Sequence, residues 1–168
     1  MSGIERGNGF LKGAKVTSQL QRQRPYAGSV VGSVLTVPSK PENVVDARKY
    51  TAKVAKRCGF SEDAIYDIKL AVSEALTNAV MHGSPRGNDN FVQVVFLCDR
   101  DRMRIIVIDE GAFGRKEVTC DYDSEGGRGL DLISCFMDYV SIHPSVSGTS
   151  VTMIKNVCRN DLKSAGAS

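Results

Sequence analysis

The 168-residue sequence has no uninterrupted apolar run approaching the ~20 residues that a membrane-spanning helix needs. Its N-terminus also lacks an apolar segment followed by a small-residue cleavage site, so we expect no signal peptide. Hydrophobic residues make up 42% and charged residues 24% of the chain, which is ordinary for a globular protein. These features predict a cytoplasmic protein that does not associate with a membrane and whose length fits one domain.

Clustered metal ligands are also missing. The five cysteines are scattered and show no C-x-x-C spacing, and the only histidines are His82 and His143. A structural zinc site needs closely spaced ligands, so we expect none. We interpret the cysteines as buried or incidental thiols in a reducing compartment. A catalytic Cys/His pair stays open, although no spacing singles one out.

The net charge of +3 is unevenly distributed. Residues 1–24 hold five basic residues and one acid, which gives +4, so the remainder carries about −1. The main domain is therefore not a basic nucleic-acid binder, and we expect no direct DNA binding. Residues 1–30 are rich in Gly, Ser, Gln and Arg, which predicts a flexible basic tail. That tail could contact nucleic acid or a membrane surface, or be an inert extension. Residues 159–168 are predicted to form a C-terminal tail.

Residues 67–83 carry the clearest pattern of the chain. At about 100° per residue of helix, an apolar stripe forms that is typical of a helix packed on a core. The stripe consists of Ile68, Val72, Ala75, Leu76 and Ala79. Glu74, Asn78 and His82 recur every four residues along one flank, with Asp67 beside them. A carboxylate and a carboxamide one turn apart can point into the same cleft, but the spacing also suits an ordinary half-exposed polar face.

Three later segments favour the cleft. Residues 104–111 form an apolar run that ends in Asp109, Glu110 and Gly111, and residues 125–133 form a glycine cluster that opens into a helical pattern. A Gly148-Thr149 pair precedes the last apolar segment. With these segments, the chain resembles the ATPase fold shared by gyrase, Hsp90, sensor histidine kinases and MutL. Among proteins of that fold, it most resembles the bacterial anti-sigma-factor serine/threonine kinases.

The resemblance covers roughly residues 33–157 and rests on four motifs in the family's order. These are E-x-x-x-N, D-x-G, G-x-G and G-T, here Glu74/Asn78, Asp109/Gly111, Gly127/Gly129 and Gly148-Thr149. One departure is present. The fuller family form is D-x-G-x-G, and this chain has Phe113 at the second glycine, with Gly114 one position later. Residues 112–127 are polar and long enough for a functional lid.

The helix motif implies a metal-dependent reaction on a phosphate. The side-chain oxygen of Asn78 suits Mg²⁺, which binds through one or two protein groups together with substrate phosphates. In the resembling kinases this Asn holds the metal that bridges the phosphates of ATP. Glu74 is placed to act as the base that orients or deprotonates the attacking hydroxyl. His82 could line the same pocket, and a structural histidine fits equally well.

The remaining motifs imply the adenine and phosphate contacts. In the resembling proteins Asp109 accepts a hydrogen bond from the adenine amino group, and Gly111 leaves room for the base. A carboxylate in a hairpin turn is the alternative for Asp109. Thr149 would add a hydroxyl near adenine, unless it is an ordinary strand residue. The N–H groups of a helix start can bind an anion, and Arg128 could add a charge-assisted contact. The phosphate segment is expected to comprise Gly127, Arg128, Gly129 and Leu130.

Period-2 and helical patterns predict the fold. Helices are expected over 41–58, from 61 into the motif helix, and over 129–136, with strands over 34–37, 91–97, 103–108, 139–143 and 149–155. Together these predict an α+β two-layer sandwich over residues 31–158. Its mixed, mostly antiparallel sheet is expected to be covered on one face by three helices.

The resemblance implies an anti-sigma factor with ATP-dependent serine kinase activity. It would bind a sigma factor, phosphorylate a serine of an anti-anti-sigma partner, and form a homodimer. A non-catalytic ATP-binding interaction module is the alternative from another class. A detached catalytic domain of a sensor histidine kinase fits less well, because the chain has no helical dimerisation segment with a phosphoacceptor histidine.

Overall fold

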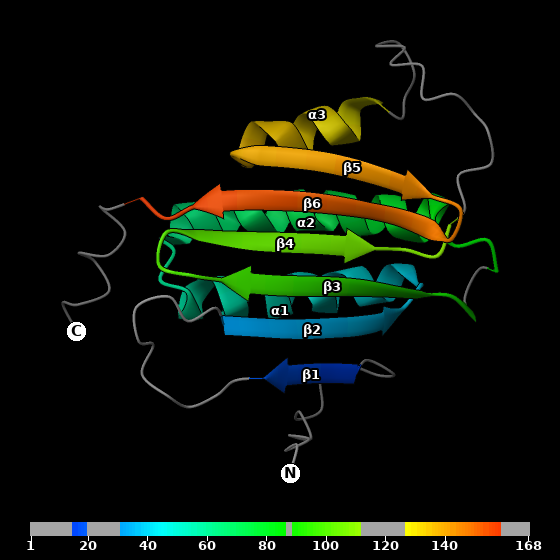
Figure 1. Cartoon of the computed structure of the whole chain (residues 1–168), viewed down its shortest axis with the longest axis horizontal. Coiled ribbons are helices and arrows are strands. Elements are labelled where there is room, and N and C mark those ends of the chain that lie inside the picture. The colour runs from blue at the N-terminus through cyan, green and yellow to red at the C-terminus, as the bar shows by residue number, and fades with distance from the viewer. Residues whose placement is uncertain (1–14, 20–30, 87–88, 112–126, 159–168) are drawn as a thin grey trace.

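A computed structural model describes residues 15–19, 31–86, 89–111 and 127–158 of the chain. In these ranges a six-stranded sheet packs against a layer of helices, as Figure 1 shows. The elements are β1 (Lys15–Gln19), β2 (Val31–Pro38), α1 (Pro41–Arg57), α2 (Glu62–His82), β3 (Phe91–Cys98), β4 (Arg102–Ile108), α3 (Gly127–Phe136), β5 (Tyr139–Ser145) and β6 (Gly148–Asn156). This arrangement confirms the predicted α+β two-layer sandwich.

The strands lie in the order β1-β2-β3-β4-β6-β5. Every pairing among the described strands is antiparallel, whereas the sequence predicted a mixed sheet. The strand beside β4 is β6 rather than β5. Because β6 runs antiparallel to both β4 and β5, no parallel pair arises. The ends of β4 and β6 that carry the D-x-G and G-T motifs are therefore neighbours, with Ile108 opposite Ser150.

The core lies between the sheet and α1 and α2, which run behind the sheet in Figure 1. Alternate residues of β2, β3 and β4 point into it, as a half-buried sheet requires. All five residues of the apolar stripe predicted for α2 are buried. Each fully buried aliphatic side chain contributes about 1.5–3 kcal/mol to folding, so this stripe holds α2 in one orientation.

Local signals define the helix ends. Pro41 lies in the first turn of α1, and Gly59 follows the helix with φ +86°, a left-handed conformation that glycine adopts at little cost. Ser61 caps α2, since its hydroxyl accepts a hydrogen bond from the Ala64 N–H at 3.3 Å. These contacts set where α2 begins and so determine which residues occupy its exposed flank.

Two expectations need correction. The tail predicted over residues 1–30 includes a strand, because residues 15–19 pair antiparallel with β2 as β1. The interpretation of the cysteines as scattered residues missed that Cys58 and Cys98 lie side by side, with a Cα–Cα distance of 6.3 Å that a disulfide can span. The two positions lie 40 residues apart, and no local pattern links the end of α1 to the end of β3. No helix in the described ranges is long and apolar enough to cross a bilayer.

Candidate active site

Glu74 and Asn78 lie on the flank of α2 where the sequence predicted them. Both side chains are half-buried, beside the buried residues Ala75 and Ala79. Residues four apart on a helix have Cβ atoms about 5–6 Å apart, so the carboxylate and the carboxamide can reach one small ligand. Among the described residues, neither side chain takes part in a hydrogen bond or ion pair.

Gly129 brings the start of α3 against this flank. A Cβ atom at position 129 would overlap the Oε1 atom of Glu74 and lie 3.2 Å from the Nδ2 atom of Asn78. Glycine therefore allows the helix start to approach both side chains. We call Glu74, Asn78 and Gly129 the α2–α3 cluster. It places a carboxylate, an amide and the N-terminal end of a helix around one point, and such a helix end favours anions.

Asp109 forms the second part of the site at the end of β4. It is 8% exposed, and its Oδ1 atom accepts hydrogen bonds from the N–H groups of Gly111, at 2.9 Å, and Thr149, at 3.0 Å. The Asp109 N–H in turn donates to the Thr149 carbonyl oxygen at 3.0 Å. Two backbone N–H groups thus bind the same carboxylate oxygen, and the third contact fixes the backbone of residue 109 against β6.

Glycines allow the close packing around Asp109. A Cβ at Gly83 would overlap the carboxyl carbon of Asp109, and one at Gly111 would overlap the Cα of Gly83. Gly148 has φ +147°, and a Cβ there would overlap the Asp109 carbonyl oxygen. We call Gly83, Asp109, Gly111 and Thr149 the β4-end cluster. Its backbone segments are in direct contact because they lack side chains where they meet.

Burial changes the acidity of this carboxyl group. Desolvation raises the pKa of Asp109 above its ordinary value of 3.8, and the N–H donors of Thr149 and Gly111 oppose the shift by stabilising the charged form. A desolvated carboxylate gains more from a new hydrogen-bond donor than an exposed one does. Asp109 is therefore suited to recognise a ligand that presents an N–H group.

The two clusters lie along the same helix. Gly83 caps the end of α2, nine residues after Glu74, which corresponds to about 13 Å of helix. An elongated ligand could therefore contact Asp109 at one end and the α2–α3 cluster at the other. The residues also fit Mg²⁺, which needs few protein oxygens when phosphates supply the rest. In the described ranges no group of three or more His, Cys, Asp or Glu side chains could hold a metal by itself.

The other predicted site residues differ in how the structure places them. His82 is the exposed last residue of α2, and Leu130 packs against the hydrophobic core. Gly127 begins α3, and Arg128 follows it in the first turn. Thr149 contributes its backbone groups to Asp109, while the role of its hydroxyl stays a prediction. A lid was also predicted over residues 112–127. Residues 112–126 of this segment lie outside the described ranges.

Asp67 belongs to a structural contact instead. Its carboxylate pairs with the Lys155 Nζ atom at 3.1 Å, and the same ammonium group donates to the Phe136 carbonyl oxygen at 2.7 Å. The lysine thus joins α2, β6 and the last turn of α3, where cations are favourable. This contact holds α3 beside α2 and so supports the α2–α3 cluster from a distance.

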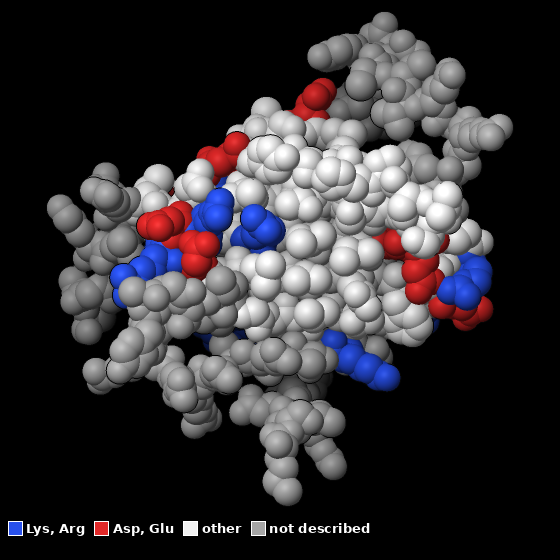
Figure 2. All heavy atoms as spheres, in the orientation of Figure 1, with Lys and Arg blue, Asp and Glu red and all other residues white. Residues whose placement is uncertain are grey.

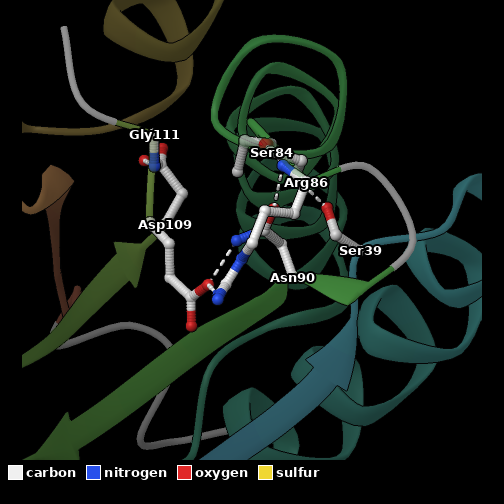
Figure 3. A network of polar contacts seen from close by, with 8 residues as sticks. Ser39, Ser84, Arg86, Asn90, Asp109 and Gly111 are labelled. Carbon is white, nitrogen blue, oxygen red and sulfur yellow. Dashed lines mark hydrogen bonds and ion pairs between the residues drawn. The ribbon is translucent and has the colours of Figure 1, made fainter.

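The sequence analysis missed several residues around Asp109. Residue 83 was noted only as the end of the motif segment 67–83, and Arg86, Asn90 and Glu110 were assigned no role. The structure joins these three in a polar network, shown in Figure 3. The only local signal was an amide just before a strand and an acid just after another. Neither indicates a partner 20 or more positions away.

Comparison with known proteins agrees with this geometry. Residues 37–155 match the model of the histidine kinase-like ATPase domain. The serine-protein kinase RsbW of Bacillus velezensis is 40% identical over 133 residues, covering 72% of this chain and 82% of the relative. The RsbW of Bacillus subtilis is 39% identical over the same length and with the same coverage.

The chain belongs to the RsbW serine-protein kinases of the histidine kinase-like ATPase family. A solved structure of the RsbU and RsbW domains of a Mycobacterium tuberculosis protein shares the fold, with a TM-score of 0.59 at 21% identity. The match covers 74% of this chain and 31% of that longer one. Membership of an RsbW kinase family makes this protein an ATP-using kinase, and the residues of the two clusters can be assigned roles on that basis.

Proposed function

We propose that this RsbW-family protein is an anti-sigma factor that binds Mg·ATP and phosphorylates a serine of an anti-anti-sigma partner. The observation that carries the proposal is the α2–α3 cluster, in which Glu74, Asn78 and the start of α3 surround one point. Phosphoryl transfer depends mainly on positioning and charge stabilisation, and these groups supply both. ATP supplies the phosphoryl group when it is bound.

Each residue has a distinct task in this proposal. The Asn78 side-chain oxygen would hold Mg²⁺ against the phosphates. Glu74, one turn earlier, would orient the serine hydroxyl and accept its proton. The N–H groups at the start of α3 would stabilise phosphate charge. At the other end of the site, the Asp109 carboxylate would accept a hydrogen bond from the adenine amino group, while the glycine at position 111 lets the segment pack against Gly83.

A homodimer in the cytoplasm is the assembly that the family resemblance implies. The sheet face turned away from the helices supports it, because few charged side chains lie over its middle, as Figure 2 shows. Half-buried apolar residues from neighbouring strands line this face, namely Val34, Val95 and Ile106. Apolar side chains gathered on an open sheet face can mark an association site. Sedimentation of the full chain as a monomer at micromolar concentration would contradict a dimer formed through this face.

A transfer assay tests the kinase proposal. The purified protein is incubated with Mg²⁺, γ-labelled ATP and candidate anti-anti-sigma proteins, and the labelled residue is identified. Transfer to serine, stable in acid, is expected. Acid-labile histidine label would favour a histidine kinase module. ATP binding with no transfer to a partner that the protein demonstrably binds would favour a nucleotide-gated interaction module.

A metal titration tests the α2–α3 cluster within the same proposal. Calorimetry of ATP binding with and without Mg²⁺ is compared between the wild type and Asn78→Ala. We expect Mg²⁺ to strengthen binding in the wild type and to have little effect in the variant. An equal Mg²⁺ effect in both proteins would remove Asn78 from the metal site.

A further inference from the structure

A polar network anchors the segment that carries Asp109 and Gly111. The side chain of Glu110, between them, contacts Arg86 and Asn90 in the segment that follows α2. Its Oε2 atom accepts a hydrogen bond from the Asn90 Nδ2 atom and pairs with the Arg86 Nη2 atom at 2.5 Å. Glu110 therefore joins the end of β4 to the loop that connects α2 to β3.

Asn90 is the fixed point of this network. It is fully buried, and its Oδ1 atom accepts from the Arg86 N–H at 2.6 Å while its carbonyl oxygen accepts from the Ser39 N–H at 2.8 Å. With the Glu110 contact, all three of these polar groups of Asn90 are bound. A buried amide held in this way has one orientation, because any other would leave a polar group unsatisfied. The exposed Arg86–Glu110 ion pair adds little by itself.

The anchor acts directly on the β4-end cluster. The Gly111 N–H that binds Asp109 belongs to the planar peptide group joining Glu110 to Gly111. Rotation of the Glu110 backbone would therefore turn this donor away from the Asp109 carboxylate. The Thr149 N–H holds the same oxygen from β6, and the Gly83 contact closes the side facing α2. Glu110 is the residue that holds this backbone from the loop side.

We propose that Glu110, bound to Asn90, is a positioning residue that determines base selectivity by fixing the backbone between Asp109 and Gly111. The inference rests on the proposed ATP site and deepens it. Glu110 itself does not touch the base. Its effect is to reduce the reorganisation needed when Asp109 meets an amino group, and such preorganisation contributes to affinity for the matching ligand only.

The test compares ATP with inosine triphosphate, which has an oxygen in place of the adenine amino group. Affinities for both are measured by calorimetry in the wild type, Glu110→Ala, Glu110→Gln and Glu62→Ala. Glu62 is the matched control, since it also forms an exposed ion pair, with Lys56 at 3.1 Å. We expect Glu110→Ala to weaken ATP binding about tenfold and inosine triphosphate binding by less than about twofold.

The remaining variants separate positioning from stability. Glu110→Gln keeps an acceptor for Asn90, so most of the selectivity should return, and Glu62→Ala should match the wild type. Equal weakening of both nucleotides by Glu110→Ala, or no weakening of either, would overturn the inference. A wild type that binds ATP but does not prefer it would overturn it together with the base-reading role of Asp109. A wild type that binds neither nucleotide would contradict the proposed function itself.

Discussion

The two ends of the candidate site are built in different ways. In the β4-end cluster, backbone N–H groups and glycine contacts hold a buried carboxylate from several sides. In the α2–α3 cluster, Glu74 and Asn78 are half-buried and bound to no other described residue, and only their helix and Gly129 position them. One end is preorganised by the fold, and the other depends on ligands to complete it.

This contrast follows from the chemistry expected at each end. An adenine base is rigid and is recognised by fixed hydrogen-bond partners, so a preformed site loses little entropy on binding. Phosphates and Mg²⁺ change charge and geometry during transfer, and the groups around them must accept a metal, a hydroxyl and a proton in turn. Changes at the first end should therefore alter affinity and stability, and changes at the second should alter the rate.

Glu74→Gln should produce the largest effect. The substitution keeps the shape of the side chain and removes the proton acceptor, so single-turnover transfer to the partner serine should fall by at least about 100-fold. ATP affinity should change little, because the α2–α3 cluster otherwise stays intact. Both quantities are measured on the same preparations. Unchanged transfer in the variant would show that Glu74 is not the base.

Substituting a glycine of each cluster should separate stability from rate. Gly111→Ala places a Cβ against the backbone of Gly83, which cannot move aside, so it should lower the free energy of unfolding by about 1–3 kcal/mol. Gly129→Ala places a Cβ against the end of the Glu74 side chain, which can rotate away. It should therefore leave stability nearly unchanged and slow transfer.

Thermal unfolding of both variants, together with their transfer rates, tests this pair. The control is Gly32→Ala, because a Cβ at Gly32 meets its nearest atom, the Cδ2 of Leu97, at 3.4 Å, an ordinary contact distance. If Gly129→Ala destabilised the protein as much as Gly111→Ala, the difference between the two ends would not hold.

Asp109→Asn should have an intermediate effect on binding. Replacing the carboxylate by an amide presents an N–H₂ group where an acceptor is needed, and an unpaired buried polar group costs about 1–3 kcal/mol. ATP affinity should fall accordingly, and the preference of the wild type for ATP over GTP should shrink. Competition binding with the two nucleotides measures this. Indistinguishable ATP and GTP affinities in the wild type would rule out base recognition by Asp109.

Acidification should produce the smallest effect. Because burial raises the pKa of Asp109 above 3.8, protonation begins at a higher pH than in the unfolded chain. The raised pKa means that Asp109 favours folding below pH 3.8, and this contribution is lost as the pH rises through the folded-state pKa. The ATP affinity depends on pH in the opposite direction, because only the ionised carboxylate can accept the hydrogen bond from the base. The ATP affinity of the wild type should therefore fall toward that of Asp109→Asn as the pH is lowered from neutrality toward 3.8.

ATP itself also becomes protonated on acidification, but to the same extent with the wild type and with Asp109→Asn. The difference between their affinities therefore excludes this effect. A constant affinity difference over this pH range would mean that Asp109 does not titrate within it. A difference that grew on acidification would contradict its role as an acceptor.

Local sequence patterns are sufficient to predict the helix that carries the site. The spacing of the α2 stripe, the Ser61 cap and the four-residue repeat of Glu74 and Asn78 depend only on helix geometry, which is local. The same holds for α3, expected over 129–136 and found over Gly127–Phe136, and for the strand that ends just before Asp109. Because the four motifs occur in order along these elements, the family and the role of each cluster could also be predicted.

The way in which these elements meet depends on long-range packing. Asp109 binds Thr149 across 40 residues because β6 lies beside β4, an order that no local pattern contains. The β1 strand depends in the same way on the free edge of β2. The Asn90–Glu110 contact joins two turns whose approach follows from the Gly83–Gly111 packing. Hydrogen bonds between distant segments form where packing brings the backbones together, and that packing is a property of the whole fold.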